Sequence, residues 1–193
     1  MKISPKFVVK VAGTLTVISL ITAALLGLVD GVTRDKIAEI EAEKTRIAMS
    51  AVAPAGSEFT DKLEIPAEAV EAAAAQGGKV LELYGVKAGG CVMKISASGS
   101  QGSIVMMVGV DANKAITGIS VVSHSETSGI GTKVVGNELN DAGVPVLDQF
   151  IGLSGSGSLV VKKNITPITT ATVSTKGITM GANAALAAAE ALG

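Results

Sequence analysis

Hydroxyl side chains crowd the turn that leads into the last, Ala-rich segment of the chain. Lys176 and Gly177 follow directly after six of them: Thr166, Thr169, Thr170, Thr172, Ser174 and Thr175. A helix start offers unpaired backbone N–H groups and a partial positive charge, so it readily holds a phosphate group. Hydroxyl and ammonium donors strengthen such a site. The pattern predicts a phosphate site; the alternative is a Thr-rich strand end before a helix that needs only Ser174 as its N-cap.

Other residue types that carry chemistry are scarce. His124 is the only histidine and Cys91 the only cysteine, so no ligand set for zinc, copper or an iron–sulfur cluster can be assembled. Cys91 has no partner for an internal disulfide, and we expect it to pack as a small hydrophobic residue. We expect a structural role for His124 at a strand end. Glu126, in the Gly-rich loop that follows, is either a solvated carboxylate or a ligand contact.

Length and charge narrow the class of protein. The chain has 193 residues, with 16 Lys and Arg against 17 Asp and Glu, which suits one globular domain plus a short extra segment. A nearly neutral chain lacks the basic character that nucleic-acid binding requires, so no nucleic acid is expected. With no Trp, one Tyr and three Phe, the core must be aliphatic.

Residues 11–29 form an apolar run without a charged side chain. Its length matches a bilayer core of roughly 30 Å. A buried core helix would show a polar face, and a signal peptide would be shorter and end in a small-residue cleavage site. We therefore expect a transmembrane helix in contact with the lipid bilayer. The Lys content of residues 1–10 favours a cytoplasmic N-terminus and an outward-facing remainder.

Beyond this run, helical and strand patterns occur in blocks. Residues 30–78 are predicted to form a helical connector, in which one helix ends at Pro54 and a second starts at Pro66. Residues 79–193 are predicted to form the functional domain. Consecutive strands followed by a helix indicate a mainly antiparallel sheet flanked by helices, an α+β fold. The expected strands are 79–86, 91–98, 103–110, 115–124 and 155–163, and the final helix is expected from residue 175.

Three motifs resemble those of the FMN-binding domain family. Residues 169–174, Thr-Thr-Ala-Thr-Val-Ser, resemble its S/T-G-A-T-x-S/T motif. Residues 124–131 resemble its H-x-E-T-P-G-L-G loop, and residues 148–152 its Q-F-x-G segment. This domain occurs in the G subunit of the Rnf ferredoxin:NAD oxidoreductase complex and in the C subunit of the sodium-pumping NADH:quinone reductase. The N-terminal anchor and the chain length favour resemblance to the Rnf-type G subunit.

The resemblance implies covalent FMN, attached by a flavin transferase through a phosphoester to the threonine of the Ala-Thr pair, here Thr172. It also implies cofactor contacts in the two longer motifs: Thr169, Thr170, Ala171, Ser174, Thr175, Lys176, Glu126, Thr127, Gly129 and Gly131. Two positions depart from the family pattern, which commonly has Asp in place of Thr166 and Gly in place of Thr170. Noncovalent FMN and a flavin-free domain are the alternatives that these departures leave open.

The implied role is that of an electron-transfer subunit, not a complete enzyme by itself. Its partners would be integral membrane, iron–sulfur and flavin subunits of a complex that couples ferredoxin and NAD redox to ion movement. We expect a single pass through the cytoplasmic (inner) membrane, with the domain on the extracytoplasmic side. The rival interpretations are a flavin-free, membrane-tethered assembly module and a stand-alone surface flavoprotein that passes electrons to external acceptors.

Overall fold

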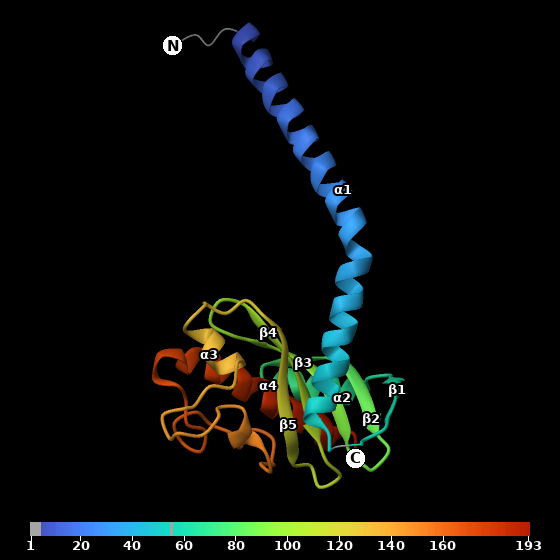
Figure 1. Ribbon diagram of the computed structural model, residues 1–193, viewed down its shortest axis with the longest axis vertical. Coiled ribbons are helices and arrows are strands. Elements are labelled where there is room, and N and C mark those ends of the chain that lie inside the picture. Colours follow the sequence, from blue (N-terminus) through green and yellow to red (C-terminus); the bar gives the residue numbers. More distant parts are fainter. Residues whose placement is uncertain (1–4, 55) are drawn as a thin grey trace. The chain divides into compact units, whose positions relative to one another are not determined.

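The computed structural model describes residues 5–54 and 56–193 (Figure 1). The chain divides into two compact units, Met1–Glu43 and Lys44–Gly193. The long helix α1, Pro5–Val52, supplies the described part of the first unit and the beginning of the second.

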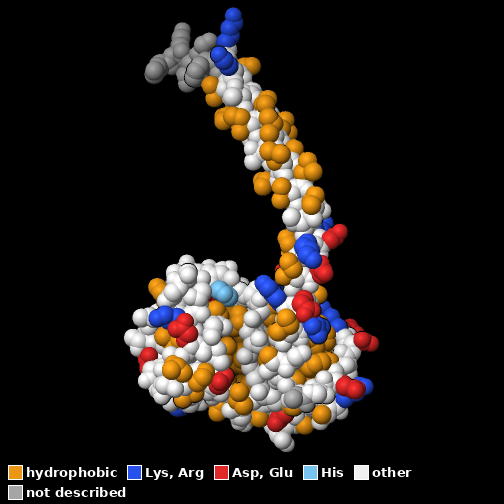
Figure 2. All heavy atoms as spheres, in the orientation of Figure 1, with side chains coloured by type: hydrophobic (Ala, Val, Ile, Leu, Met, Phe, Trp, Pro, Cys, Tyr) orange, Lys and Arg blue, Asp and Glu red, His pale blue; other side chains and the backbone are white. Residues whose placement is uncertain are grey.

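In the first unit, α1 turns apolar side chains outward along its length. Hydrophobic side chains cover this stretch in Figure 2, and large residues such as Leu15 and Leu26 are 59% and 66% exposed. The hydroxyls of Thr14 and Thr22 donate to carbonyls one turn earlier in the helix, so they are satisfied without water. By length and composition α1 is the one helix of the described residues that can cross a membrane, and none of its apolar window is buried. The alternative of a buried core helix is therefore wrong.

An antiparallel meander of five strands forms the centre of the second unit (Figure 1). Successive side chains point to opposite faces of a sheet, so Met93 and Met106 join the main core while Val92 and Met107 join a smaller cluster on the other face. The predicted α+β class is confirmed. The strands adjoin in chain order: β1 Phe59–Leu63, β2 Gly78–Val86, β3 Cys91–Ser98, β4 Ser103–Val110 and β5 Ile116–His124.

Two helices rich in alanine pack on the main-core face. They are α2, Ala67–Ala75, and α4, Thr172–Ala191. Small residues allow α4 to approach closely, because a Cβ added to Gly78 would lie 2.5 Å from the Cβ of Ala184. The connection between β5 and α4 holds three short helices: α3 Gly131–Val135, η1 Asp148–Phe150 and η2 Thr169–Ala171.

The end of α1 packs on the opposite face of the sheet. Ala48, Met49 and Val52 are buried there against the smaller cluster. The carbonyl oxygen of Val52 accepts a 2.5 Å hydrogen bond from the hydroxyl of Thr117. A Cβ added to Gly109 would collide with the same carbonyl oxygen, so glycine is required for the helix end to rest on the strands.

Some local expectations were wrong. Residues 155–163 do not form a strand and instead make one isolated bridge, Val161 to Ile165. The reason is backbone conformation: Gly155 and Gly157 both have positive φ, which bends the chain away from an extended course. The final helix begins at Thr172, earlier than expected. The strand β1 lies inside the predicted helical connector and pairs with β2.

Candidate functional site

The hydroxyl-rich turn folds as η2 and runs directly into α4 at Thr172. The residue before the helix, Ala171, supplies no side-chain hydrogen bond to cap it. Ser174 is not the N-cap that the structural alternative required, because it lies inside the first turn of α4 and is buried. No side chain caps the start of α4, so this helix end keeps the partial positive charge that favours an anion.

Glu126 joins the two longer sequence motifs. The residue is 7% exposed, and its carboxylate accepts a hydrogen bond from the hydroxyl of Ser174. The other carboxylate oxygen accepts the backbone N–H groups of Ser100 at 2.7 Å and Gln101 at 3.3 Å. A Cβ added to Gly131 would collide with this carboxylate. Glu126 is thus a buried link between two loops and the first turn of α4, and the solvated alternative is wrong.

The two departures from the family pattern are accommodated without strain. Thr170 is exposed and is not among the described residues with positive φ. Its β-branched side chain can therefore replace glycine without the strain of a left-handed backbone conformation. Thr166 is held by Gln149, a residue of the third motif. The side-chain oxygen of Gln149 accepts the Thr166 N–H at 2.8 Å, and its nitrogen donates to the Thr166 carbonyl at 3.0 Å.

Asp141 is a site residue that sequence reasoning missed. Its carboxylate accepts the backbone N–H of Thr169 at 3.1 Å and also the Thr169 hydroxyl. Its own N–H donates to the carbonyl of Pro167 at 3.2 Å. Asp141 lies 28 residues before its partner and outside all three motifs, so no local signal marked it.

Hydrogen bonds distinguish Thr172 from its neighbours. Carboxylate or carbonyl oxygens of the protein accept hydrogen bonds from the hydroxyls of three nearby residues: Thr169, Ser174 and Thr175. The hydroxyl of Thr172 makes a long 3.4 Å contact with the Thr169 carbonyl, and its side chain is partly exposed. Among the described residues of this turn, Thr172 and the exposed Thr170 are thus the hydroxyls that hydrogen bonds engage least, and Thr172 is the one at the first position of α4.

Thr172 also lies between two hollows. One, the polar cavity, has a volume of about 230 Å³ and is lined by both motifs: Ser100, Glu126, Thr127, Ile130, Gly131 and residues 169–174. The other, the α4 groove, has a volume of about 360 Å³ and is more apolar: Leu159, Val160, Val161, Lys162, Thr172, Lys176, Thr179, Met180 and Asn183. Of the predicted site residues, Gly129 and Thr175 line neither hollow.

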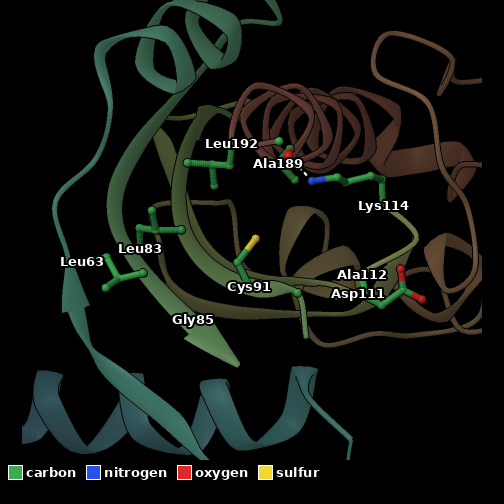
Figure 3. A pocket seen from close by; sticks show the side chains of 11 residues that line it. Leu63, Leu83, Gly85, Cys91, Asp111, Ala112, Lys114, Ala189 and Leu192 are labelled. Carbon is green, nitrogen blue, oxygen red and sulfur yellow. Dashed lines mark hydrogen bonds between the residues drawn. The ribbon is translucent and has the colours of Figure 1, made fainter. Parts of the chain in front are cut away.

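A third cavity, of about 410 Å³, lies at the C-terminal end of α4 (Figure 3). The side chain of Cys91 points into it, and burial raises the pKa of the Cys91 thiol, which Lys114 opposes in part. Lys114 donates a 2.7 Å hydrogen bond to the carbonyl of Ala189 in the last turn of α4, where a cation is favoured. A protonated thiol is a poor nucleophile, so Cys91 packs as a structural residue.

Comparison with known proteins bears on the same region. The FMN-binding domain family matches residues 99–187. The G subunit of the Na(+)-translocating ferredoxin:NAD(+) oxidoreductase complex of Acetobacterium woodii is 32% identical over 92% of this chain and 89% of its own length. The chain belongs to this family of G subunits. The G subunit of the ion-translocating oxidoreductase complex of Methanosarcina acetivorans is 28% identical over 90% of this chain and 89% of its own length.

Membership of the family makes this chain an electron-transfer flavoprotein subunit of the membrane, with FMN as its cofactor. The matched region, residues 99–187, takes in Glu126, Thr172 and both hollows beside Thr172. The residues present fit FMN, because an uncapped helix start suits a phosphate group and the adjoining apolar groove suits a flat ring.

Proposed function

We propose that Thr172 carries FMN through a phosphoester and that the chain relays electrons within an ion-translocating membrane complex. The position of the Thr172 hydroxyl is the main support. It lies at the first position of α4, whose start has no side-chain cap, and it lines both hollows, while the hydroxyls of Thr169 and Ser174 are engaged by Asp141 and Glu126.

The chain's own residues would hold the phosphate of the cofactor. A flavin transferase would join Oγ1 of Thr172 to the flavin-bearing phosphorus of a flavin dinucleotide; the hydroxyl proton would be lost and a nucleoside monophosphate would depart as the leaving group. The N–H groups of the first turn of α4 and the Lys176 ammonium then stabilise the phosphate charge. When bound, FMN supplies the redox chemistry, and a covalent tether prevents its loss.

The names of the relatives suggest the wider setting. They describe complexes that translocate ions, with ferredoxin and NAD(+) as the redox pair for the A. woodii protein. We extend that setting to this chain: other flavin, iron–sulfur and integral membrane subunits as partners, α1 in the bilayer as a single pass, and the domain from Lys44 onward outside the cytoplasmic membrane.

Flavin fluorescence in a denaturing gel tests the attachment. We expect the full chain, co-expressed with a flavin transferase, to give a fluorescent band and a mass gain equal to FMN less one water. Thr172→Ala should abolish both. Thr170→Ala is the matched control, because Thr170 is an exposed neighbouring threonine whose loss should leave the label in place.

An unlabelled but folded wild-type chain would refute the covalent bond. The flavin absorbance of the native chain would then separate noncovalent FMN from the flavin-free assembly module. Label that persists in Thr172→Ala would move the attachment to another hydroxyl. Proteolysis of the domain in intact cells tests the outward orientation, and protection of the domain until the cells are lysed would contradict it.

A further inference from the structure

Asp141 contacts the hydroxyl-rich turn from another loop. Its carboxylate accepts the backbone N–H of Thr169 at 3.1 Å and also the Thr169 hydroxyl, so its two oxygens hold one residue. Thr169 is the first residue of η2, and Ile168 before it gives no side-chain hydrogen bond to cap the turn. An N–H group at a helix start has no acceptor inside the helix. Asp141 therefore supplies the cap of η2 from 28 residues away in the sequence.

The loop that carries Asp141 is closed by its own hydrogen bonds. Asn140 is 7% exposed, and its side-chain oxygen accepts the N–H groups of Ala142 at 2.9 Å and Val144 at 3.1 Å. The Asn140 N–H donates to the Val144 carbonyl at 2.8 Å, and the Asp141 N–H donates to the Pro167 carbonyl at 3.2 Å. The carboxylate is thus held in place beside the turn, so little conformational entropy is lost when it caps it.

Position 166 is where an acid could cap the same turn locally. A carboxylate accepts hydrogen bonds from N–H groups two or three residues later in the chain, and Thr169 lies three residues after Thr166. The FMN-binding domain pattern commonly has Asp where this chain has Thr166. Gln149 holds the N–H and the carbonyl of Thr166 at 2.8 and 3.0 Å, so the backbone there is fixed close to the turn. An acid at position 166 and the acid at position 141 can therefore serve the same N–H group.

The cap bears on Thr172 through the backbone of the turn. The Thr169 carbonyl is the 3.4 Å contact of the Thr172 hydroxyl, and the Ala171 N–H donates to the Ile168 carbonyl at 2.8 Å. Both contacts require residues 168–171 to keep their conformation. Thr169 is exposed, so burial does not hold it there. Without the carboxylate, its N–H and its hydroxyl would bond to water, and the turn could open.

We propose that Asp141 is a positioning residue for flavin attachment, which replaces an acid at position 166 by capping η2 from a separate loop. It holds the Thr172 hydroxyl in the geometry that a flavin transferase requires. Asp141 is not among the residues that line the polar cavity or the α4 groove, so it acts through Thr169. This inference rests on the proposed function and adds the residue that prepares the acceptor.

Rescue by an acid at position 166 tests this inference. The purified full chain, in detergent, is incubated with a flavin transferase and a flavin dinucleotide, and the fluorescence of the gel band over time gives the rate constant of labelling. We expect Asp141→Ala to lower this rate constant about tenfold to a hundredfold, because a small displacement of a reacting group costs about that much. Thr166→Asp, added to Asp141→Ala, should restore most of the lost rate.

Two controls separate positioning from a general effect on the fold. Glu138→Ala removes an exposed carboxylate of the same segment and should label like the wild type. Thr166→Asp alone should also label like the wild type, because the Thr169 N–H already has its acceptor. Thermal unfolding of every variant accompanies the labelling. If Asp141 only stabilised the fold, labelling would follow the melting temperature and not the presence of an acid beside Thr169.

Wild-type labelling of Asp141→Ala would overturn the inference, and so would a double variant that labels no faster than Asp141→Ala. Faster labelling of Thr166→Asp than of the wild type would also overturn it, because an acid at position 166 would then have a role that Asp141 does not fill. In each of these cases the wild-type label at Thr172 would leave the proposed function standing. An unlabelled wild-type chain would remove the proposed covalent attachment together with this inference.

Discussion

Two carboxylates hold the residues on either side of Thr172. Asp141 engages Thr169, and Glu126 engages Ser174. Each carboxylate comes from a loop distant in the sequence. The order of the helix start therefore depends on two side chains that do not belong to the turn itself.

At Glu126 we expect a stability defect on truncation. Glu126→Ala leaves the N–H groups of Ser100 and Gln101 and the Ser174 hydroxyl without their acceptor, which costs about 1–3 kcal/mol or more. Thermal unfolding of the full chain in detergent measures it. Glu138→Ala, an exposed carboxylate of the following segment, should melt like the wild type; an equal loss in both variants would contradict the role of the buried hydrogen bonds.

Asp141 should affect flavin attachment more than stability. Asp141→Ala releases the backbone and the hydroxyl of Thr169, whose carbonyl is the 3.4 Å contact of the Thr172 hydroxyl. We expect slower labelling of Thr172 in a timed reaction with flavin transferase, with the melting temperature nearly retained. Unchanged labelling kinetics would mean that the position of Thr169 has no influence on the acceptor.

The end of α1 lies directly against the backbone of the sheet, where Gly109 of β4 contacts the carbonyl oxygen of Val52. Gly109→Ala would drive a Cβ into the Val52 carbonyl oxygen, and such overpacking costs about 1–3 kcal/mol. We expect a lower melting temperature and faster proteolysis after Val52. Gly31→Ala is the control, because nothing lies within 4 Å of the added Cβ and alanine favours a helix. Similar effects for both variants would argue against the contact.

Acid should weaken the last turn of α4 through Glu190. Hydrogen bonds from the hydroxyl and the N–H of Ser156 lower the pKa of Glu190 below its ordinary 4.5. A lowered pKa stabilises the fold above the ordinary value, and this contribution is lost as the pH falls through the folded-state pKa. Glu190→Gln should therefore have a slightly lower melting temperature than the wild type at pH 7, and the difference should disappear as the pH falls through the lowered folded-state pKa of Glu190. A difference in melting temperature that persists in acid would show that the substitution acts through packing and not through the charge of Glu190.

Truncation tests the division of the whole molecule. A chain that starts at Lys44 keeps the buried residues Ala48, Met49 and Val52, so we expect it to fold, accept flavin and remain in the soluble fraction. A chain that starts at residue 57 exposes Val92 and Met107 and should melt at a lower temperature. Equal melting temperatures would show that the end of α1 adds no stability.

Sequence patterns predicted the regular elements because hydrophobic periodicity reports local burial. The central strands and the Ala-rich helix followed from it. The pattern failed at residues 155–163, where apolar Val160 and Val161 suggested a strand but Gly155 and Gly157 bend the backbone. That irregular segment became one wall of the α4 groove.

The site itself was only partly visible in the sequence. The local motifs contained Thr172 and Glu126, and the fold brings them to one cavity. Asp141 and Asn183 were not predicted, because their hydrogen bonds join residues far apart in the chain and no local spacing encodes them.

The burial of the sulfur-containing side chains determines which of them oxygen species can oxidise. Reduced flavins react with oxygen, and the products oxidise thiols and thioethers. Met93, Met106 and Met107 are fully buried, and the raised pKa of Cys91 keeps its thiol in the less reactive protonated form. Met180 is only partly buried and lines the α4 groove. Oxidative damage from the protein's own cofactor should therefore appear first as a sulfoxide at Met180.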